Sequence, residues 1–337
     1  MSRITLVLSE YTFNIDPILK GLTKMKQTVK TLLILALGIM LIPCIAFFKD
    51  SLFKVKDKPL PDKVKIYLTE DKTVKTISRM DYLLYSTLAS IPMDMSDETI
   101  KAQMILQNTY IAREAESPDP SLDGAHISDD ETVYQKVFTK EEASGVYDNL
   151  DEILKRLKPL AEEVYDTVLT YGGDPVAVAY FERSFGSTES AEDIWGEDIS
   201  YLTSVDCDTD KEEEASETEI SKDDLKKTFE NQLDISLSDD YDSWIKVIKE
   251  SKNDTPLKVL IDGQKEMSAS ELYMLLSLPS QHFTFKVTDE AFVFSTKGSG
   301  HLVGFCQSYA EQLSSEGKSF EEILNYFYKG CEIKSIK

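Results

Sequence analysis

Residues 77–110 read ISRMDYLLYSTLASIPMDMSDETIKAQMILQNTY, and this stretch decides the fold. Apolar residues recur at helical spacing over Met80–Ala89 and again over Asp97–Ala112, where the second helix begins around Ser96. The stretch therefore predicts two consecutive helices.

The same stretch resembles the opening motif of the stage II sporulation protein D family, membrane-anchored peptidoglycan lytic transglycosylases of endospore-forming bacteria. Ala89-Ser90-Ile91-Pro92 falls on the family's Ala-Glu-Met-Pro element, and Lys101-Ala102-Gln103 and Thr109-Tyr110 match the family identically. The resemblance implies that the family's catalytic glutamate falls on Ser90 and that one of its arginines falls on Asn108.

A serine at this position changes the chemistry that the site can perform. Cleavage of a glycosidic bond needs an acid that protonates the leaving oxygen, and the hydroxyl of Ser90 is too weak an acid. The carboxylates of Asp94, Asp97 and Glu98 are nearby in the sequence. Either they cap the helix that begins there, or Asp94 or Glu98 has taken over the acid role. We assign no catalytic residue.

Three later blocks resemble the family in the same order: residues 179–206, residues 267–283, and residues 298–310 followed by the closing segment 320–333. In the second of these, two family arginines are replaced by Tyr273 and Pro279. The resemblance implies that a set of polar residues contacts sugar: Lys101, Gln103, Tyr110, Ser184, Thr188, His301, Gln307 and Tyr309. For Ser184 and Thr188 a purely structural turn is the alternative. For His301 with Cys306 a base and nucleophile pair is the weaker alternative.

The N-terminal region predicts one membrane anchor. Residues 31–48 carry no charge over a length that just spans a bilayer, and they lack the small residues of a cleavage site. We therefore predict a tail over residues 1–30, a linker over residues 49–63 and one domain over residues 64–337. Lysines on both sides of the span leave the orientation open, so the resemblance alone implies a cytoplasmic tail and an extracytoplasmic domain. Met25 is an alternative start.

Periodicity predicts further elements of an α+β fold. Strands are predicted over Val64–Leu68, Thr73–Ile77 and Val176–Phe181. Helices are predicted over Glu141–Lys158, ending at Pro159, and over Tyr241–Ser251, where Trp244 is expected to pack rather than bind sugar. Residues 114–131 are predicted to form a loop.

The charge and cysteine content exclude several classes of protein. A formal net charge of -23 disfavours binding to nucleic acid. The four cysteines, Cys44, Cys207, Cys306 and Cys331, have no metal-type spacing, and outside the span they allow at most one disulfide.

Metal binding is also disfavoured. Members of the family can carry a zinc held by cysteine and histidine in the loop after the first helix, but residues 114–138 contain His126 and no cysteine. The acidic loop predicted over residues 206–222 matches part of a calcium loop, but Lys211 replaces the glycine that such a loop needs. We predict neither metals nor cofactors.

The resemblance covers residues 64–337 and implies a role in septal wall remodelling during engulfment. The absent glutamate and arginines favour a non-catalytic relative that binds glycan strands or partners such as the stage II sporulation proteins P and M. The alternative is an active lytic transglycosylase with a displaced carboxylate. The expected location is the cell membrane, with the domain in the septal intermembrane space.

Overall fold

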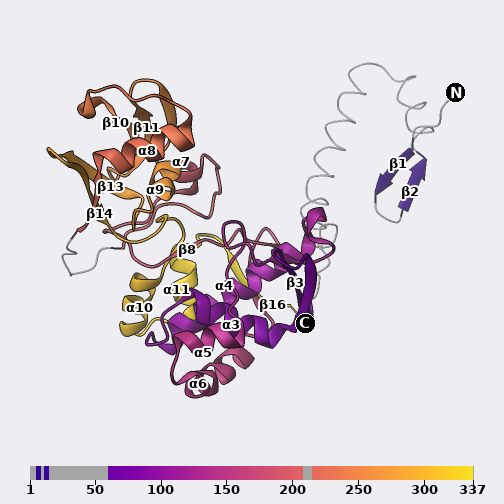
Figure 1. Cartoon of the computed structure of the whole chain (residues 1–337). Helices are drawn as coiled ribbons and strands as arrows, with labels where there is room; N and C mark the ends of the chain where they lie inside the picture. Colours follow the sequence, from indigo (N-terminus) through magenta and orange to yellow (C-terminus); the bar gives the residue numbers. More distant parts are fainter. Residues whose placement is uncertain (1–4, 9–10, 15–59, 208–214, 337) are drawn as a thin grey trace, which may run out of the picture. The chain divides into compact units, whose positions relative to one another are not determined.

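The computed structural model describes residues 5–8, 11–14, 60–207 and 215–336 (Figure 1). Strands β1 (Thr5–Leu8) and β2 (Tyr11–Asn14) form an antiparallel hairpin. The predicted membrane-spanning segment, residues 31–48, lies outside the described residues. Among the helices that are described, none is both long enough and apolar enough to cross a bilayer.

A three-stranded sheet precedes the helices at the start of the domain. Strand β3 (Lys63–Leu68) pairs antiparallel with β4 (Thr73–Ser78) and parallel with the short β5 (Ile127–Ser128). Val64 is fully buried and Ile66 nearly so, while Lys63 and Lys65 face solvent. Both strands predicted in this region are confirmed.

Helices α3 (Arg79–Ser90) and α4 (Asp97–Glu116) confirm the two helices predicted from the opening stretch. The side chain of Ser78 accepts a hydrogen bond from the amide of Asp81 at 3.0 Å and so caps α3. Every residue from 99 to 109 of α4 is buried, so this helix is enclosed on all sides and forms the centre of the core.

The remaining elements of what we call the main body, residues 60–207 and 298–336, pack around α3 and α4. Helices α5 (Lys140–Val146) and α6 (Leu150–Glu163) contact α3, and α10 (Gln307–Ser315) and α11 (Phe320–Phe327) contact α4. A second sheet has the order β16-β6-β7, and the short β8 and β15 pair in parallel. The bounds are β6 (Thr167–Tyr171), β7 (Asp174–Pro175), β8 (Tyr180–Phe181), α7 (Ala191–Trp195), β15 (Phe305–Cys306), β16 (Glu332–Ser335) and the 3-10 turn η1 (Pro120–Leu122).

Residues 215–297 form an inserted lobe with its own core (orange in Figure 1). Its two three-stranded sheets have the orders β10-β11-β12 and β13-β14-β9. Trp244 is 1% exposed and stacks on Phe292 with ring centroids 5.7 Å apart, so its predicted packing role is confirmed. The bounds are β9 (Ser216–Ser221), α8 (Lys222–Leu233), η2 (Tyr241–Ser243), β10 (Ile245–Glu250), β11 (Pro256–Ile261), β12 (Lys265–Ser268), α9 (Ala269–Leu275), β13 (His282–Val287) and β14 (Ala291–Lys297).

The chain returns from the inserted lobe through the glycine-rich segment that precedes β15. Arg183 and Ser299 form an antiparallel bridge, and Glu189 and Val303 form a parallel one. Gly304 has a φ of +81°, and a Cβ atom there would lie 2.4 Å from the carbonyl oxygen of Ala179. The glycine thus serves the close approach of two backbone segments.

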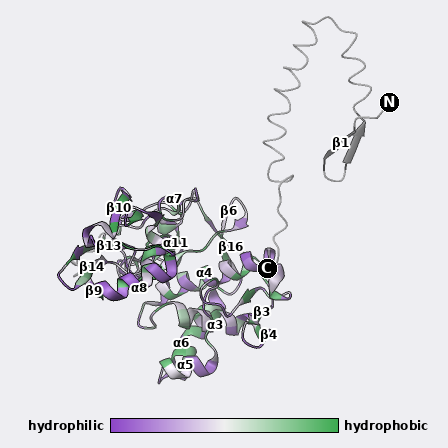
Figure 2. Ribbon diagram, turned by 45° about the horizontal axis from the view of Figure 1, so that its top comes forward, coloured by the Kyte–Doolittle hydropathy of each residue, from purple (hydrophilic) through white to green (hydrophobic). Residues whose placement is uncertain are grey.

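The helix predicted over Glu141–Lys158 with an end at Pro159 is wrong. Two helices are present, α5 and α6, and Pro159 lies inside α6, whose ribbon carries both apolar and polar residues (Figure 2). The proline is tolerated because it and Lys155 are exposed, so the carbonyl that loses its intrahelical partner can meet water.

Other predicted elements are wrong in type or length. The segment 241–251 forms η2 and strand β10 rather than a helix, because a short apolar run fits either period. Only residues 180–181 of the strand predicted over Val176–Phe181 are a strand. Residues 216–221 of the predicted acidic loop form β9, and residues 208–214 lie outside the described ranges. The predicted loop 114–131 contains the end of α4, η1 and β5.

Candidate functional site

Ser90 is the last residue of α3, and its hydroxyl is fully used in hydrogen bonds. Its Oγ donates to the carbonyl oxygen of Ser86 at 2.7 Å and accepts from Nε2 of Gln107 at 2.8 Å. The phenol oxygen of Tyr180 lies 2.9 Å from the same Oγ and acts as the donor, since the only hydroxyl proton of Ser90 is already committed. Ser90 is therefore held in place and has no proton free to transfer.

Two further glutamines extend this network towards α10. The Nε2 of Gln307 donates to the carbonyl oxygen of Ser90 at 2.7 Å and to Oε1 of Gln103 at 3.1 Å. Gln103 and Gln107 are fully buried and Gln307 is 3% exposed. Burial raises the pKa of Tyr180, although hydrogen bonds with Ser90 and Gln107 oppose it, so the phenol stays protonated. The network is uncharged throughout.

An open groove of about 500 Å³ lies over this network. It combines aromatic side chains with the polar atoms of Ser90 and Gln307, a composition that suits the apolar faces and hydroxyls of a sugar. The lining residues are Leu88, Ala89, Ser90, Ile91, Pro92, Phe138, Tyr147, Tyr180, Phe181, Glu182 and Gln307.

Glu182 is the one carboxylate among the residues that line the groove. It is exposed, and its Oε2 accepts a hydrogen bond from Oγ of Ser299 at 2.8 Å. Its backbone carbonyl accepts from the amide of Ser308, which fixes the segment after β8 to the start of α10. No cationic side chain lines the groove in the described part of the chain.

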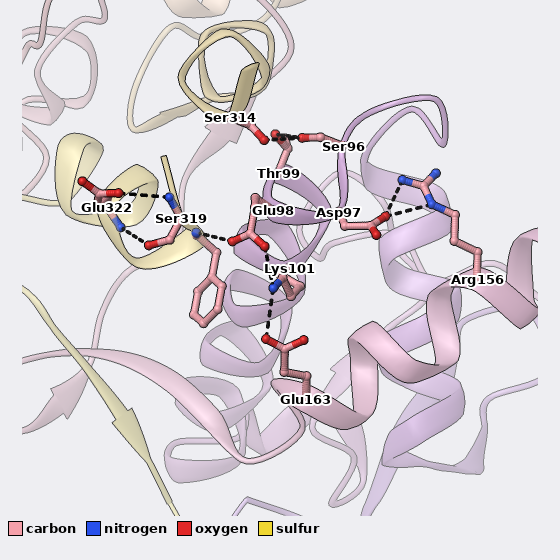
Figure 3. Close-up of polar contacts among 11 residues, drawn as sticks. Ser96, Asp97, Glu98, Thr99, Lys101, Arg156, Glu163, Ser314, Ser319 and Glu322 are labelled. Carbon is pink, nitrogen blue, oxygen red and sulfur yellow. Dashed lines mark hydrogen bonds and ion pairs between the residues drawn. The ribbon is translucent and has the colours of Figure 1, made fainter. Parts of the chain in front are cut away.

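The carboxylates considered as replacement acids lie elsewhere. Asp97 pairs with Arg156 at 2.7 Å (Figure 3). That guanidinium also donates to the carbonyl oxygens of Met93 and Met95. Asp94 is exposed and is absent from the groove lining. The ion pair of Asp97 therefore clamps the turn between α3 and α4 to α6.

Glu98 and Lys101 form a second ion-pair cluster at the start of α4 (Figure 3). The Nζ of Lys101 lies 2.6 Å from Oε1 of Glu98 and 3.0 Å from Glu163, and it sits over the ring of Phe320. Oε2 of Glu98 accepts the amide of Phe320 at 2.8 Å. Lys101 is buried, so it holds α4, α6 and α11 together and is absent from the groove lining.

Asn108, at the position of a family arginine, is fully buried. Its Nδ2 donates to the carbonyl oxygens of Val164 and Tyr165 at 2.9 and 3.1 Å. Arg79 approaches the same segment, pairing with Asp166 at 2.8 Å. Asn108 therefore fixes the segment between α6 and β6.

The other predicted sugar contacts lie outside the groove lining. The hydroxyl of Tyr110 accepts the amide of Gln135, and Oγ1 of Thr188 accepts the amide of Val205 at 2.9 Å. Nδ1 of His301 accepts the amide of Val303, and burial lowers the pKa of this histidine to about 4. Tyr309 packs its ring on Tyr326 with centroids 5.5 Å apart, and Ser184 is 5% exposed. Of the eight residues, Gln307 alone lines the groove, with Gln103 beneath it.

No cluster of three or more histidine, cysteine or acidic residues that could hold a metal ion occurs in the described ranges. The side chain of His126 accepts the amide of Lys65 at 3.3 Å, and burial lowers its pKa. His126 thus joins the loop after α4 to β3.

Sequence reasoning missed Glu182 and the partners of Ser90, namely Gln107 and Tyr180. The sequence could have indicated that Tyr180 and Glu182 lie together, because they are two residues apart in an extended segment and so face the same side. The contact of Gln107 with Ser90 had no such signal, since it joins two helices through their packing.

The chain is similar in sequence to several known proteins. The chain is 27% identical over 283 residues to stage II sporulation protein D of Bacillus subtilis, covering 82% of this chain and 80% of that protein. It is 26% identical over 281 residues to stage II sporulation protein D of Bacillus amyloliquefaciens, with the same coverage. An uncharacterized protein of Brachyspira hyodysenteriae is 26% identical over 255 residues, which is 72% of this chain and 64% of that protein. No protein-family model matches the chain. The four blocks in family order and the similarity to these two relatives, over 82% of the chain, support the same conclusion: the chain resembles the stage II sporulation protein D family.

Proposed function

We propose that this protein acts in cell-wall remodelling during sporulation as a non-catalytic member of its family that binds glycan strands. The observation that carries the proposal is the state of Ser90. Its hydroxyl takes the position of the family glutamate and is saturated by Ser86, Gln107 and Tyr180. A site arranged in this way can bind a sugar but offers no proton to a glycosidic oxygen at this position.

The groove supplies what glycan binding needs. Phe138, Tyr147 and Tyr180 present rings that can pack on the apolar faces of sugars, and Ser90 and Gln307 contribute polar atoms. Tyr147 is fixed by a hydrogen bond from its hydroxyl to the carbonyl oxygen of Leu88 at 3.0 Å. A ring that is already fixed loses little conformational entropy when a ligand packs on it.

A second candidate function, lytic transglycosylation with a displaced carboxylate, is favoured by one observation. Glu182 lies in the groove, whereas Asp97 and Glu98 are engaged in ion pairs and Asp94 is on the surface. Against this candidate, Glu182 is exposed, and the carboxylic acids that protonate glycosidic oxygens usually sit in apolar pockets. Glu182 is therefore better suited to accept hydrogen bonds from sugar hydroxyls.

The proposal extends to location and partners. The charge-free segment 31–48 supports a single membrane anchor. The resemblance to the family supports a domain on the outer side, in the septal space. The resemblance to the family supports cooperation with other engulfment proteins, such as the stage II sporulation proteins P and M. Binding to either partner can be tested with the purified full chain by co-purification.

The deciding experiment incubates the full chain in detergent with stem-peptide-free glycan strands. We expect binding in a sedimentation assay and no 1,6-anhydro-muramic ends by mass spectrometry, with an active family member run in parallel. Appearance of such ends would overturn the non-catalytic proposal. Loss of those ends in Glu182→Gln would then identify the acid.

Two tyrosine variants separate groove binding from general adhesion. Tyr147→Ala removes a groove ring and is expected to weaken binding about tenfold, which corresponds to ~1.4 kcal/mol. Tyr171→Ala removes a tyrosine of 43% exposure that does not line the groove, and it is expected to bind normally. Equal binding by both variants would place the glycan elsewhere on the protein.

A further inference from the structure

Trp195, the last residue of α7, is a large aromatic residue that the fold leaves in contact with water. It is 41% exposed, whereas Trp244, the other of the two tryptophans in the chain, is 1% exposed. Single exposed apolar residues are common on protein surfaces, so exposure alone assigns no role to this ring. What lies next to Trp195 decides what the ring can do.

Two ring contacts connect Trp195 to the groove over Ser90. The ring centroid of Trp195 lies 5.5 Å from that of His301, and the centroid of His301 lies 5.9 Å from that of Phe181. Both distances are those of aromatic rings in contact. Phe181 lines the groove. A single ring therefore separates Trp195 from the groove lining.

The backbone that carries Trp195 is held at both ends of α7. Oγ of Ser190 accepts the amide of Asp193 at 3.1 Å and caps the start of the helix. At its end, the carbonyl oxygen of Ile194 accepts a hydrogen bond from Oγ of Ser270 in the inserted lobe at 3.4 Å. A ring on a backbone that is already fixed loses less conformational entropy when a ligand packs on it.

Polar atoms accompany these rings. Glu182 follows Phe181 in the sequence, lines the groove and accepts a hydrogen bond from Oγ of Ser299 at 2.8 Å. Ser299 is in turn two residues from His301. A polysaccharide has apolar ring faces and hydroxyl groups along its edges, so it fits a surface on which aromatic rings and hydrogen-bond acceptors lie together.

We propose that Trp195 is a second sugar-binding platform, and that a glycan strand several sugars long binds across the groove, His301 and Trp195. The inference rests on the proposed function, because it extends the groove in which the glycan is proposed to bind. A short oligosaccharide fills the groove alone, whereas a longer strand also reaches Trp195. The protein therefore prefers long strands to short ones.

The binding test titrates the full chain in detergent with N-acetylglucosamine oligomers of two and of six sugars, followed by calorimetry. We expect the wild type to bind the longer oligomer more tightly. Trp195→Ala should weaken binding of the six-sugar oligomer about tenfold and leave binding of the two-sugar oligomer unchanged. Tyr147→Ala, which removes a ring of the groove itself, should weaken binding of both.

Tyr241→Ala is the matched control. Tyr241 is also 41% exposed, but it packs on Trp244 in the inserted lobe and does not line the groove. This variant should bind both oligomers as the wild type does. Equal losses in Tyr241→Ala and Trp195→Ala would show general adhesion to exposed rings and would overturn the inference.

Tryptophan fluorescence reports on Trp195 directly. Because Trp244 is buried, acrylamide quenches mainly the emission of Trp195. The six-sugar oligomer should protect the wild type from quenching, and the two-sugar oligomer should not. In Trp195→Phe, where Trp244 is the remaining tryptophan, the protection should disappear. Protection that persists in this variant would contradict the role given to Trp195.

The outcomes separate this inference from the proposed function. If Trp195→Ala binds the six-sugar oligomer as tightly as the wild type does, and the oligomer leaves the quenching of the wild type unchanged, the second platform is overturned and binding in the groove still stands. If the wild type binds neither oligomer, the platform and the proposed glycan binding are overturned together.

Discussion

At the scale of single residues, Ser90 illustrates how one hydroxyl can serve the packing of several elements. The hydroxyl of Ser90 ends α3 by donating to the carbonyl oxygen of Ser86, and it also satisfies Gln107 and Tyr180. The serine is thus part of the packing between α3, α4 and β8, whatever ligand the groove holds.

Replacing this hydroxyl should therefore reduce stability. In Ser90→Ala the buried Nε2 of Gln107 loses its nearer acceptor and keeps only the phenol oxygen of Tyr180 at 3.5 Å, so we expect the free energy of unfolding to fall by ~1–3 kcal/mol. Urea unfolding followed by circular dichroism measures the change. Ser144→Ala is the matched control, since its Oγ makes the same bond to the carbonyl of residue 140 on an exposed helix. A loss of the same size in both variants would contradict the role given to Ser90.

The sequence could locate Ser90 but not its surroundings. The helix that carries it is strongly periodic and the motif around it is contiguous, so its place at a helix end was predictable. Gln107 and Tyr180 reach it from other elements, and only tertiary packing brings them there. For the same reason the partners of Lys101 could not be predicted, because Glu163 and Phe320 come from distant helices.

At the scale of elements, the helix pair α3 and α4 was predictable because each helix is long and periodic. The short elements were not. Residues 241–251 contain too few apolar positions to separate a period of 3.6 from a period of 2, and pairing with β11 decides for a strand. Helix α6 passes through Pro159 because its tertiary packing outweighs the local cost of proline.

This cost leads to a prediction for α6. Pro159→Ala restores an intrahelical hydrogen bond at an exposed position, and we expect the free energy of unfolding to rise by ~1–2 kcal/mol. The urea midpoint reports the change. The neighbouring exposed Lys158→Ala should alter stability by less than ~0.5 kcal/mol. An unchanged or lower midpoint for Pro159→Ala would mean that the helix is strained without its proline.

At the scale of the whole molecule, a buried polar chain joins the main body to the inserted lobe. Oε1 of Glu189 accepts from Oγ1 of Thr255 at 2.6 Å and from Oγ of Ser251 at 3.0 Å. The same Thr255 hydroxyl lies 3.1 Å from Nδ1 of His282, which stacks on Phe185. The carboxyl group of Glu189 and the imidazole of His282 are thus both removed from water at the junction between the main body and the inserted lobe.

These two groups give the junction a pH dependence of defined sign. Burial, followed by the positive charge of Lys297, lowers the pKa of His282 to about 4, although Asp254 opposes the shift. In the unfolded chain the pKa of a histidine is about 6.5. The contribution of His282 to stability is therefore complete above about pH 6.5 and is lost as the pH falls from there towards 4. Burial raises the pKa of Glu189, although hydrogen bonds from Thr255, Ser251 and Asn253 oppose the rise. Its contribution has the opposite sign and is lost as the pH rises above about 4.3.

Urea midpoints measured between pH 4.5 and 7.5 separate the two contributions. In His282→Asn the decline of stability towards low pH should shrink by about 1–2 kcal/mol, a value reduced for solvent screening. In Glu189→Gln the decline should become steeper, because the opposing carboxyl is gone. The same pH profile in wild type and both variants would show that neither group titrates on unfolding.

The first and last strands of the inserted lobe pair side by side, with Ser216 opposite Thr296, and this has a consequence for how such a protein can diversify. A segment whose two ends are neighbours can be lengthened, shortened or exchanged without rerouting the rest of the chain. The inserted lobe also carries its own core around Trp244, Phe229 and Phe292. Substitutions in the inserted lobe can therefore accumulate without altering the groove around Ser90.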